Sequence, residues 1–235
     1  MINSFKKFIT LLAITLCCWV TYHATRLAIA DIIHYPVKNW IESVDITMPI
    51  SEFELIQAED KILKSIRFNP DNAEYWEYLG RIHYLRAISH YQDDSLFNKF
   101  ILMAYHSHKK AISLRPQWPY SWANLALMKS HLQQLDVEYL YAVNQAVLYG
   151  PWEIASNEAI VQAGFNGWRK LNINSRNMTT EALERVYQQA PKAARALLAH
   201  YSRQATVCPM LVLDKFRQDK ICKDIPLFTP STPNR

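Results

Sequence analysis

The feature that most constrains the fold of this chain is a proline that recurs six residues ahead of a tryptophan. Pro70 precedes Trp76, and Pro116 precedes Trp122, by the same interval. Proline ends a helix because it lacks an N–H and restricts the residue before it, so each proline marks a corner between two helices. The following tryptophan offers a large apolar surface for the next helix to bury. The spacing therefore predicts helical hairpins that stack on one another.

Residue spacings ahead of these prolines recur as well, mostly with small residues, although Tyr139 stands where a small residue is usual. Ala58, Ile62, Ser65 and Pro70 hold the same intervals as Ala104, His108, Ala111 and Pro116, and Tyr139, Val143, Ala146 and Pro151 repeat them again. Small side chains at such positions let two helix backbones approach closely. Together with Trp76, Leu79 and Gly80, the pattern resembles the tetratricopeptide repeat, a helical hairpin that stacks into a solenoid. The resemblance implies a binding scaffold and not a catalyst.

The distance between the prolines indicates that one hairpin is enlarged. Pro70 and Pro116 are 46 residues apart, whereas Pro116 and Pro151 are 35 apart. A plain repeat of this kind has about 34 residues. About twelve extra residues, a little over three helical turns, therefore lie between Gly80 and Ala104. We expect both helices of that hairpin to be lengthened.

The whole pattern predicts an all-α chain. Residues 51–155 are expected to form a tetratricopeptide-like α-solenoid, and residues 156–205 to form capping helices, with Thr179 as an N-cap. Asn157 stands where the next tryptophan would fall, so the repeat is expected to degrade there. The alternative is an ordinary helical bundle in which the proline spacings arise by chance.

An uncharged stretch near the N-terminus sets the expected location. Residues 8–25 carry no charge, and Lys6 and Lys7 precede them. A membrane-spanning helix needs about 20 mainly apolar residues, and basic residues stay on the cytoplasmic side. We therefore expect a single-pass transmembrane helix at residues 8–25, with residues 1–7 in the cytoplasm and the remainder outside it.

Two other interpretations of this stretch stay open. Ala28-Ile29-Ala30 has the A-x-A pattern of a signal-peptide cleavage site, which would release a secreted protein. The polar spacer from Tyr22 to Leu27 favours the uncleaved anchor, and a buried core helix is the third interpretation. Residues 26–50 are expected to form a connector beside the membrane, broken at Pro36 and Pro49.

Two cysteines lie in the expected C-terminal tail, residues 206–235. A location outside the cytoplasm permits disulfides. A bond between Cys208 and Cys222 would close a loop of roughly 15 residues, worth about 3 kcal/mol in the chain-entropy model. Their spacing does not match the paired C-x2-C of a zinc site. The sequence therefore predicts a structural disulfide, with two free thiols as the alternative.

Signals of catalysis are absent or weak. The sequence has no P-loop, G-x-S-x-G, G-x-G-x-x-G or H-E-x-x-H motif. His106 and His108 point to different helix faces, and Asp93 and Asp94 indicate a helix start more than a catalytic pair. The formal net charge of +5 is too small and too scattered to favour nucleic-acid binding. We expect no enzyme activity, cofactor, metal ion or nucleic-acid partner.

One helix face carries the candidate binding residues. Glu77, Arg81 and Tyr84 follow one another at helical steps. In tetratricopeptide arrays the first helices of the hairpins line a concave groove, and Tyr120 would face it from the next hairpin. A groove that mixes arginine with tyrosine suits a peptide, and aromatic platforms also suit sugar rings. The alternative is an ordinary solvated face with scattered aromatic residues.

Two runs extend the resemblance over most of the chain, residues 146–153 (Ala-Val-Leu-Tyr-Gly-Pro-Trp-Glu) and 164–171 (Gly-Phe-Asn-Gly-Trp-Arg-Lys-Leu). With the N-terminal anchor, about three repeat-like units and the late Cys208, they are similar to the small membrane-anchored proteins of bacterial exopolysaccharide clusters, the VpsP-like family. The resemblance implies a scaffold in the bacterial inner membrane, with a periplasmic domain that docks a protein of a polysaccharide assembly or export machine. It implies no active-site residues.

Two further functions remain as alternatives. The first is assembly of another envelope machine, such as a pilus, a secretion system or a cytochrome maturation complex. The second is an enzyme that acts on glycan, which would need paired carboxylates in a cleft; Asp93 and Asp94 are adjacent candidates.

Overall fold

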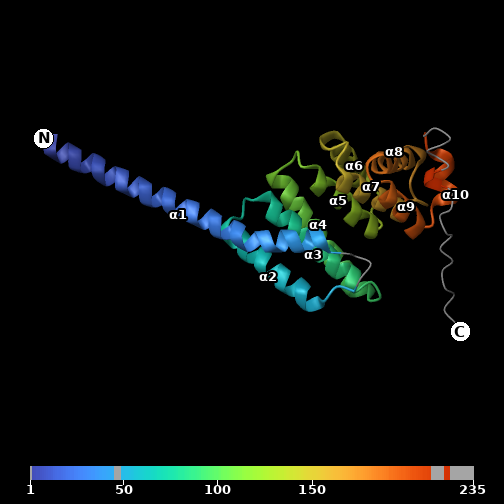
Figure 1. Ribbon diagram of the computed structural model, residues 1–235, viewed down its shortest axis with the longest axis horizontal. Coiled ribbons are helices and arrows are strands. Elements are labelled where there is room, and N and C mark those ends of the chain that lie inside the picture. Colours follow the sequence, from blue (N-terminus) through green and yellow to red (C-terminus); the bar gives the residue numbers. More distant parts are fainter. Residues whose placement is uncertain (1, 45–48, 213–219, 223–235) are drawn as a thin grey trace.

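The computed structural model describes residues 2–44, 49–212 and 220–222, and its regular elements are all helices (Figure 1). In chain order they are α1 (Ile2–Ser43), α2 (Glu52–Phe68), α3 (Ala73–Ser89), α4 (Asp94–Leu114), α5 (Pro119–His131), α6 (Val137–Tyr149), α7 (Ile154–Gly167), α8 (Ile173–Gln189), α9 (Pro191–His200), α10 (Gln204–Val207) and the short 3-10 helix η1 (Cys208–Met210). The described residues contain no strand, so the prediction of an all-α chain is confirmed. Most of the expected C-terminal tail lies outside the described residues.

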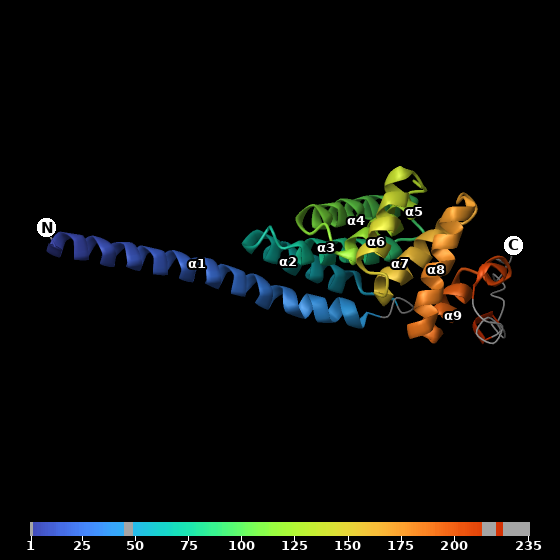
Figure 2. The same cartoon turned by 90° about the horizontal axis from the view of Figure 1, so that it is seen from above.

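The first part of α1 projects away from the other helices (Figures 1 and 2). Its large apolar side chains between Phe5 and Tyr22 are exposed. The helix is long and apolar enough to cross a membrane, although a signal sequence would have the same length and composition. The interpretation of this stretch as a buried core helix is wrong, because none of its apolar window is buried.

The predicted break at Pro36 is also wrong, because α1 runs through this proline as far as Ser43. Pro36 lies on the exposed face of the helix. Ala30, Val37 and Ile41 on the other face are buried with apolar residues of α2 and α3. Burial of this face outweighs the hydrogen bond that proline cannot donate. The expected connector is therefore helical up to Ser43, and α1 passes without interruption from its exposed part into the packed helices.

The remaining helices pack largely in consecutive pairs. α3 lies against α4, α5 against α6, and α7 against α8, while α5 also contacts α4 and α7 (Figure 1). α3 has 17 residues and α4 has 21, whereas α5 and α6 have 13 each. The first pair thus holds the twelve or so extra residues expected between Gly80 and Ala104, and the predicted lengthening of both helices is confirmed.

The corners between successive pairs share one hydrogen bond. In each corner a side-chain N–H donates to the carbonyl of the proline six residues earlier: Trp76 to Pro70 at 2.8 Å, Trp122 to Pro116 at 2.6 Å, and Asn157 to Pro151 at 2.9 Å. The donor is the fourth residue of α3, α5 and α7 respectively. Asn157 was expected to mark the end of the repeat, but its amide replaces the indole N–H in the same bond.

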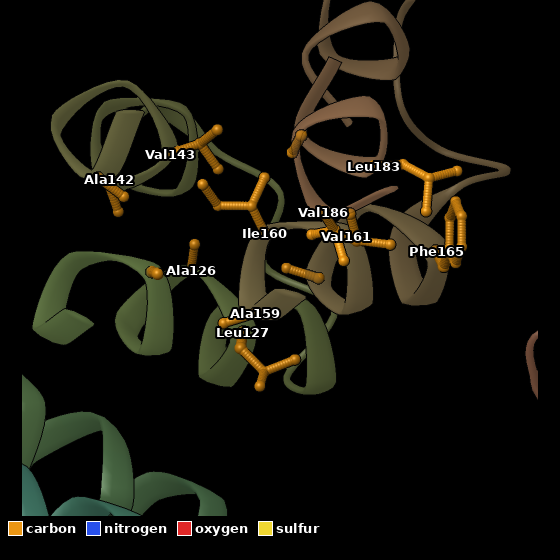
Figure 3. Packing of buried hydrophobic residues seen from close by; sticks show 14 of the residues in the cluster. Ala126, Leu127, Ala142, Val143, Ala159, Ile160, Val161, Phe165, Leu183 and Val186 are labelled. Carbon is orange, nitrogen blue, oxygen red and sulfur yellow. The ribbon is translucent and has the colours of Figure 1, made fainter. Parts of the chain in front are cut away.

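Two apolar clusters hold the helices together. The smaller one joins the packed part of α1 to α2 and α3. The larger one extends from the end of α3 to the C-terminal helices, and Figure 3 shows part of it. There, Ala126, Ala142 and Ala159 keep α5, α6 and α7 close, while Ile160 and Phe165 fill the space beside them.

Two expected helix starts have different outcomes. Asp93 caps α4 as predicted, since its carboxylate accepts hydrogen bonds from the N–H groups of Ser95 and Leu96. Thr179 is not an N-cap, because it lies buried inside α8, which is capped by Asn172. The physical reason is packing: Thr179 occupies the space beside Gly164, where an added Cβ would come within 2.1 Å of its Oγ1.

The C-terminal end of the described chain is fastened by a disulfide. Cys208 and Cys222 are bonded, with their Cα atoms 6.1 Å apart. The bond holds residues 220–222 beside η1, and Ile221 is buried in the larger cluster with Val207.

Replacing Gly80 tests the close contact between α3 and α4. A Cβ at this position would come within 2.5 Å of Cε1 of His108. In an exposed helix interior, glycine to alanine stabilises by about 1 kcal/mol. Here we expect Gly80→Ala to lower the free energy of unfolding by about 1–3 kcal/mol, because overpacking forces the helices apart. Urea unfolding of the detergent-solubilised chain, followed by far-UV circular dichroism, measures the change.

The control for this prediction is the same substitution in a His108→Ala background. Removing the imidazole makes room for the new methyl group, so Gly80→Ala should then cost much less. An equal cost in both backgrounds would contradict the explanation by close contact.

Candidate functional site

A hollow of about 650 Å³ opens on one side of the helical domain. Its walls come from α1, α3, α5 and α7, and we call it the groove. The residues that line it include Lys38, Glu42, Arg81, Tyr84, Tyr120 and Glu158. Its volume falls within the usual range for ligand sites in proteins.

All four residues predicted for a partner groove line this one hollow. Glu77, Arg81 and Tyr84 reach it from α3, and Tyr120 reaches it from α5. The structure therefore brings together side chains that are up to 43 residues apart in the sequence. The four do not have the same role, because the carboxylate of Glu77 is already engaged inside the protein.

Glu77 forms the floor of the groove and joins three helices. Glu77 is only 3% exposed to solvent. Oε2 lies 2.9 Å from Nδ1 of His108 on α4 and accepts a hydrogen bond from Oγ of Ser121 on α5 at 2.6 Å. Oε1 accepts a second bond from α5, from Nδ2 of Asn124 at 2.7 Å. With both oxygens bonded internally, Glu77 holds α3, α4 and α5 together and offers no free charge to a partner.

The environment of Glu77 keeps it ionised. Burial alone would raise the pKa of this carboxyl group, but the adjacent His108 and the hydrogen bonds from His108, Ser121 and Asn124 outweigh it. They lower the pKa from 4.5 to about 2. The buried carboxylate is therefore hydrogen-bonded at both oxygens, as a buried charge must be.

The α1 wall of the groove is held against α3 by polar contacts. Nζ of Lys38 lies 2.8 Å from Oε1 of Glu74, the hydroxyl of Tyr78 donates to Glu42 at 2.6 Å, and the hydroxyl of Tyr75 donates to Asp31. His34 is buried between the rings of Tyr75 and Tyr78, with centroids 4.8 and 5.1 Å away, and burial lowers its pKa. These contacts fix α1 as a wall of the groove.

Two charged groups in the groove form neither an ion pair nor a side-chain hydrogen bond with the described residues. The guanidinium of Arg81 lies 5.2 Å from the ring centroid of Tyr78 and makes only this cation–π contact. Glu158 on α7 is half-buried, and burial raises its pKa. No described neighbour compensates its charge. Both groups are therefore available to a bound molecule.

Aromatic rings form the part of the groove near the start of α5. Trp118 and Tyr120 meet edge to face, with centroids 6.2 Å apart, and the guanidinium of Arg115 stacks on Trp118 at 4.3 Å. The hydroxyl of Tyr120 donates to Glu153 at the start of α7. This wall is preorganised, because its rings are held by one another and by fixed polar contacts.

The sequence prediction missed the groove residues of α1 and α7. Lys38 and Glu42 were assigned to a connector, and no feature of the local sequence shows that this segment packs on α3. Glu158 had a usable signal: it follows Asn157 as Glu77 follows Trp76, so extending the register by one more unit would have placed it on the same face.

The groove presents charged and aromatic side chains to a ligand. The described residues contain no group of three or more His, Cys, Asp or Glu side chains placed to bind a metal ion. Comparison of the chain with models of protein families, with characterised proteins and with solved structures finds no match.

The low pKa of Glu77 predicts a specific acid sensitivity. A lowered pKa means that this carboxylate stabilises the folded state fully above pH 4.5, and that the contribution is lost as the pH falls toward 2. We expect Glu77→Gln to lower the free energy of unfolding at pH 7 by about 3 kcal/mol, because it removes the anion beside buried His108. It should also flatten the loss of stability between pH 4.5 and 2.

Urea unfolding at a series of pH values, followed by tryptophan fluorescence, measures both effects. Glu181→Gln is the matched control, because Glu181 is exposed on α8 and its side chain is 58% accessible. Curves for wild type and Glu77→Gln that run parallel from pH 7 to 2 would contradict the assignment.

Proposed function

We propose that this chain is a membrane-anchored, non-enzymatic scaffold that docks an extended segment of a partner protein in its groove. The observation that carries the proposal is the groove itself, a hollow walled by α1, α3, α5 and α7, with aromatic rings and two unpaired charges. An extended segment can lie across the four helices that line the groove, place side chains between them and contact both Arg81 and Glu158.

We also propose that the helices form a tetratricopeptide-like solenoid. The repeated bond from the fourth residue of α3, α5 and α7 to a proline carbonyl supports this, as does the pairing of each of these helices with the next one. The packed half of α1 lies antiparallel to α2 and takes the place of a first helix (Figures 1 and 2). In this arrangement the first helices share the concave side.

We propose further that α1 is an uncleaved anchor in a bacterial inner membrane, with the helical domain in the periplasm. The A-x-A site at residues 28–30 lies within α1, and Ala30 is fully buried. Nε of Arg26 also donates to the carbonyl of Phe68 at 2.6 Å. Cleavage after Ala30 would cut α1 within the part that packs against α2 and α3. The disulfide between Cys208 and Cys222 fits an oxidising compartment.

The machine that we propose is one of exopolysaccharide assembly or export. This part rests on the resemblance to the VpsP-like family and on the layout of an anchor followed by a scaffold. The argument for a glycan-acting enzyme rested on Asp93 and Asp94, and the carboxylate of Asp93 is engaged as the N-cap of α4. The alternative function, assembly of another envelope machine, is told apart from this one by identifying the docked partner.

Charge reversal in the groove tests the docking function. We expect Arg81→Glu to abolish co-purification of the partner from cross-linked membranes and to reduce secreted polymer as severely as deletion of the gene. Lipid-linked precursors should persist, because no catalyst is lost. The measurements are quantitative mass spectrometry of the purified complex and a chemical assay of secreted polymer.

Lys192→Glu is the control, because it makes the same charge change on an exposed residue of α9 outside the groove. Partner recovery at the wild-type level from Arg81→Glu would exclude the groove as the docking surface. Unchanged polymer secretion in the deletion strain would remove the exopolysaccharide assignment.

Topology is tested by joining a reporter that is active only outside the cytoplasm to Arg235. We expect an active fusion, because Lys6 and Lys7 keep the N-terminus inside. The intact mass of the purified chain should retain the residues before Asp31. An inactive fusion would contradict the orientation, and a mass that begins at Asp31 would contradict the uncleaved anchor.

A further inference from the structure

We propose that the groove selects a basic partner segment, and that a lysine or arginine of this segment binds the carboxylate of Glu158. The inference rests on the proposed docking function and specifies the chemistry of the docked segment. Three observations carry it: the balance of charge in the groove, the position of Glu158, and the aromatic wall that shares the groove with it.

The groove has an excess of negative charge after its internal pairs are removed. Its lining contains the carboxylates of Glu42, Glu74, Glu77 and Glu158 and the cations of Lys38 and Arg81. Lys38 is paired with Glu74, and Glu77 is bonded to His108. Glu42 and Glu158 then face a single cation, Arg81. A segment that carries positive charge complements this surface, and one that carries only negative charge is repelled.

Glu158 is the carboxylate with the most to gain from a ligand. It is half-buried and has no compensating cation, so its ionised form is disfavoured in the free protein. A lysine or arginine brought by a partner would supply the missing charge at a site that is already partly desolvated. Glu42 lacks this property, because the hydroxyl of Tyr78 already donates to it.

The two unpaired charges lie toward different walls of the groove. Arg81 is stacked on Tyr78, which is bonded to Glu42 of α1, whereas Glu158 belongs to α7. A bound segment would therefore run with its basic side chain toward α7 and with an acceptor, a carboxylate or a backbone carbonyl, toward Arg81. This polarity fixes which side of the groove receives the basic side chain.

Aromatic residues suit the rest of a long basic side chain. Trp118 and Tyr120 line the same groove, and Tyr120 is tied to the first turn of α7 through Glu153. Rings of this kind accept the aliphatic stem of lysine or arginine and the face of a guanidinium. Arg115 already shows this contact on Trp118, at 4.3 Å.

The test places a photo-crosslinking amino acid, p-benzoylphenylalanine, at position 118 of the full-length chain in cells. Mass spectrometry then maps the crosslinked partner segment. We expect this segment to contain a lysine or arginine within a few residues of the crosslink. Glu158→Gln should lower the crosslinking yield by tenfold or more, the usual effect of losing a charged hydrogen bond. Glu158→Lys should abolish crosslinking, and replacing the partner's basic residue by glutamate should restore it.

Stability separates loss of recognition from loss of folding. Glu158→Gln removes an uncompensated charge, so its unfolding midpoint should equal or exceed that of the wild type. The control variant is Glu181→Gln, which removes one carboxylate from the exposed face of α8 and should leave the yield unchanged.

The possible outcomes separate failure of the basic-segment inference from failure of the docking function. A crosslinked protein segment without a basic residue, or a yield that Glu158→Gln does not change, overturns the basic-segment inference and leaves the docking function standing. No protein crosslinked at position 118, or a crosslink to glycan, overturns the docking function itself.

Discussion

The buried carboxylate of Glu77 is the interaction on which the rest of the domain depends. It joins α3 to α4 through His108 and to α5 through Ser121 and Asn124. The contact with α4 is possible only because Gly80, one turn further along α3, leaves space for the imidazole. The same bonds hold Glu77 in the lining of the groove, so the charge that stabilises the helix pairs also forms part of the surface that we propose binds a partner.

α1 links that surface to the proposed membrane anchor. Its exposed apolar part and its packed part form one helix, and the packed part supplies Lys38 and Glu42 to the groove. The helix is continuous from the proposed anchor through Pro36 to Ser43, so the wall of the groove is a direct extension of the anchor helix. A segment bound between α1 and α7 would thus touch the anchor helix directly, and the direction of the groove relative to the membrane would be set by α1.

The sequence predictions that succeeded depend on residues close together in the chain, and those that failed depend on contacts with other helices. The proline corners and the enlarged first hairpin depend on residues close together in the chain, and they were found at Pro70, Pro116 and between Gly80 and Ala104. The break predicted at Pro36 failed, because the cost of one proline is local while the burial that overcomes it comes from α2 and α3. Thr179 failed as an N-cap for the same reason, since Gly164 on another helix gives its side chain a place to pack.

By itself the sequence determined the helical class, the helix corners and a stretch apolar enough to cross a membrane, because each follows from local periodicity, proline chemistry or composition. It also placed Glu77, Arg81, Tyr84 and Tyr120 around one groove. Only the tertiary structure decided what those charges do. Glu77 and Glu158 hold the same place in the register, yet Glu77 meets three partners on α4 and α5, while Glu158 meets no cation. That difference depends on which helix comes to lie beside each carboxylate.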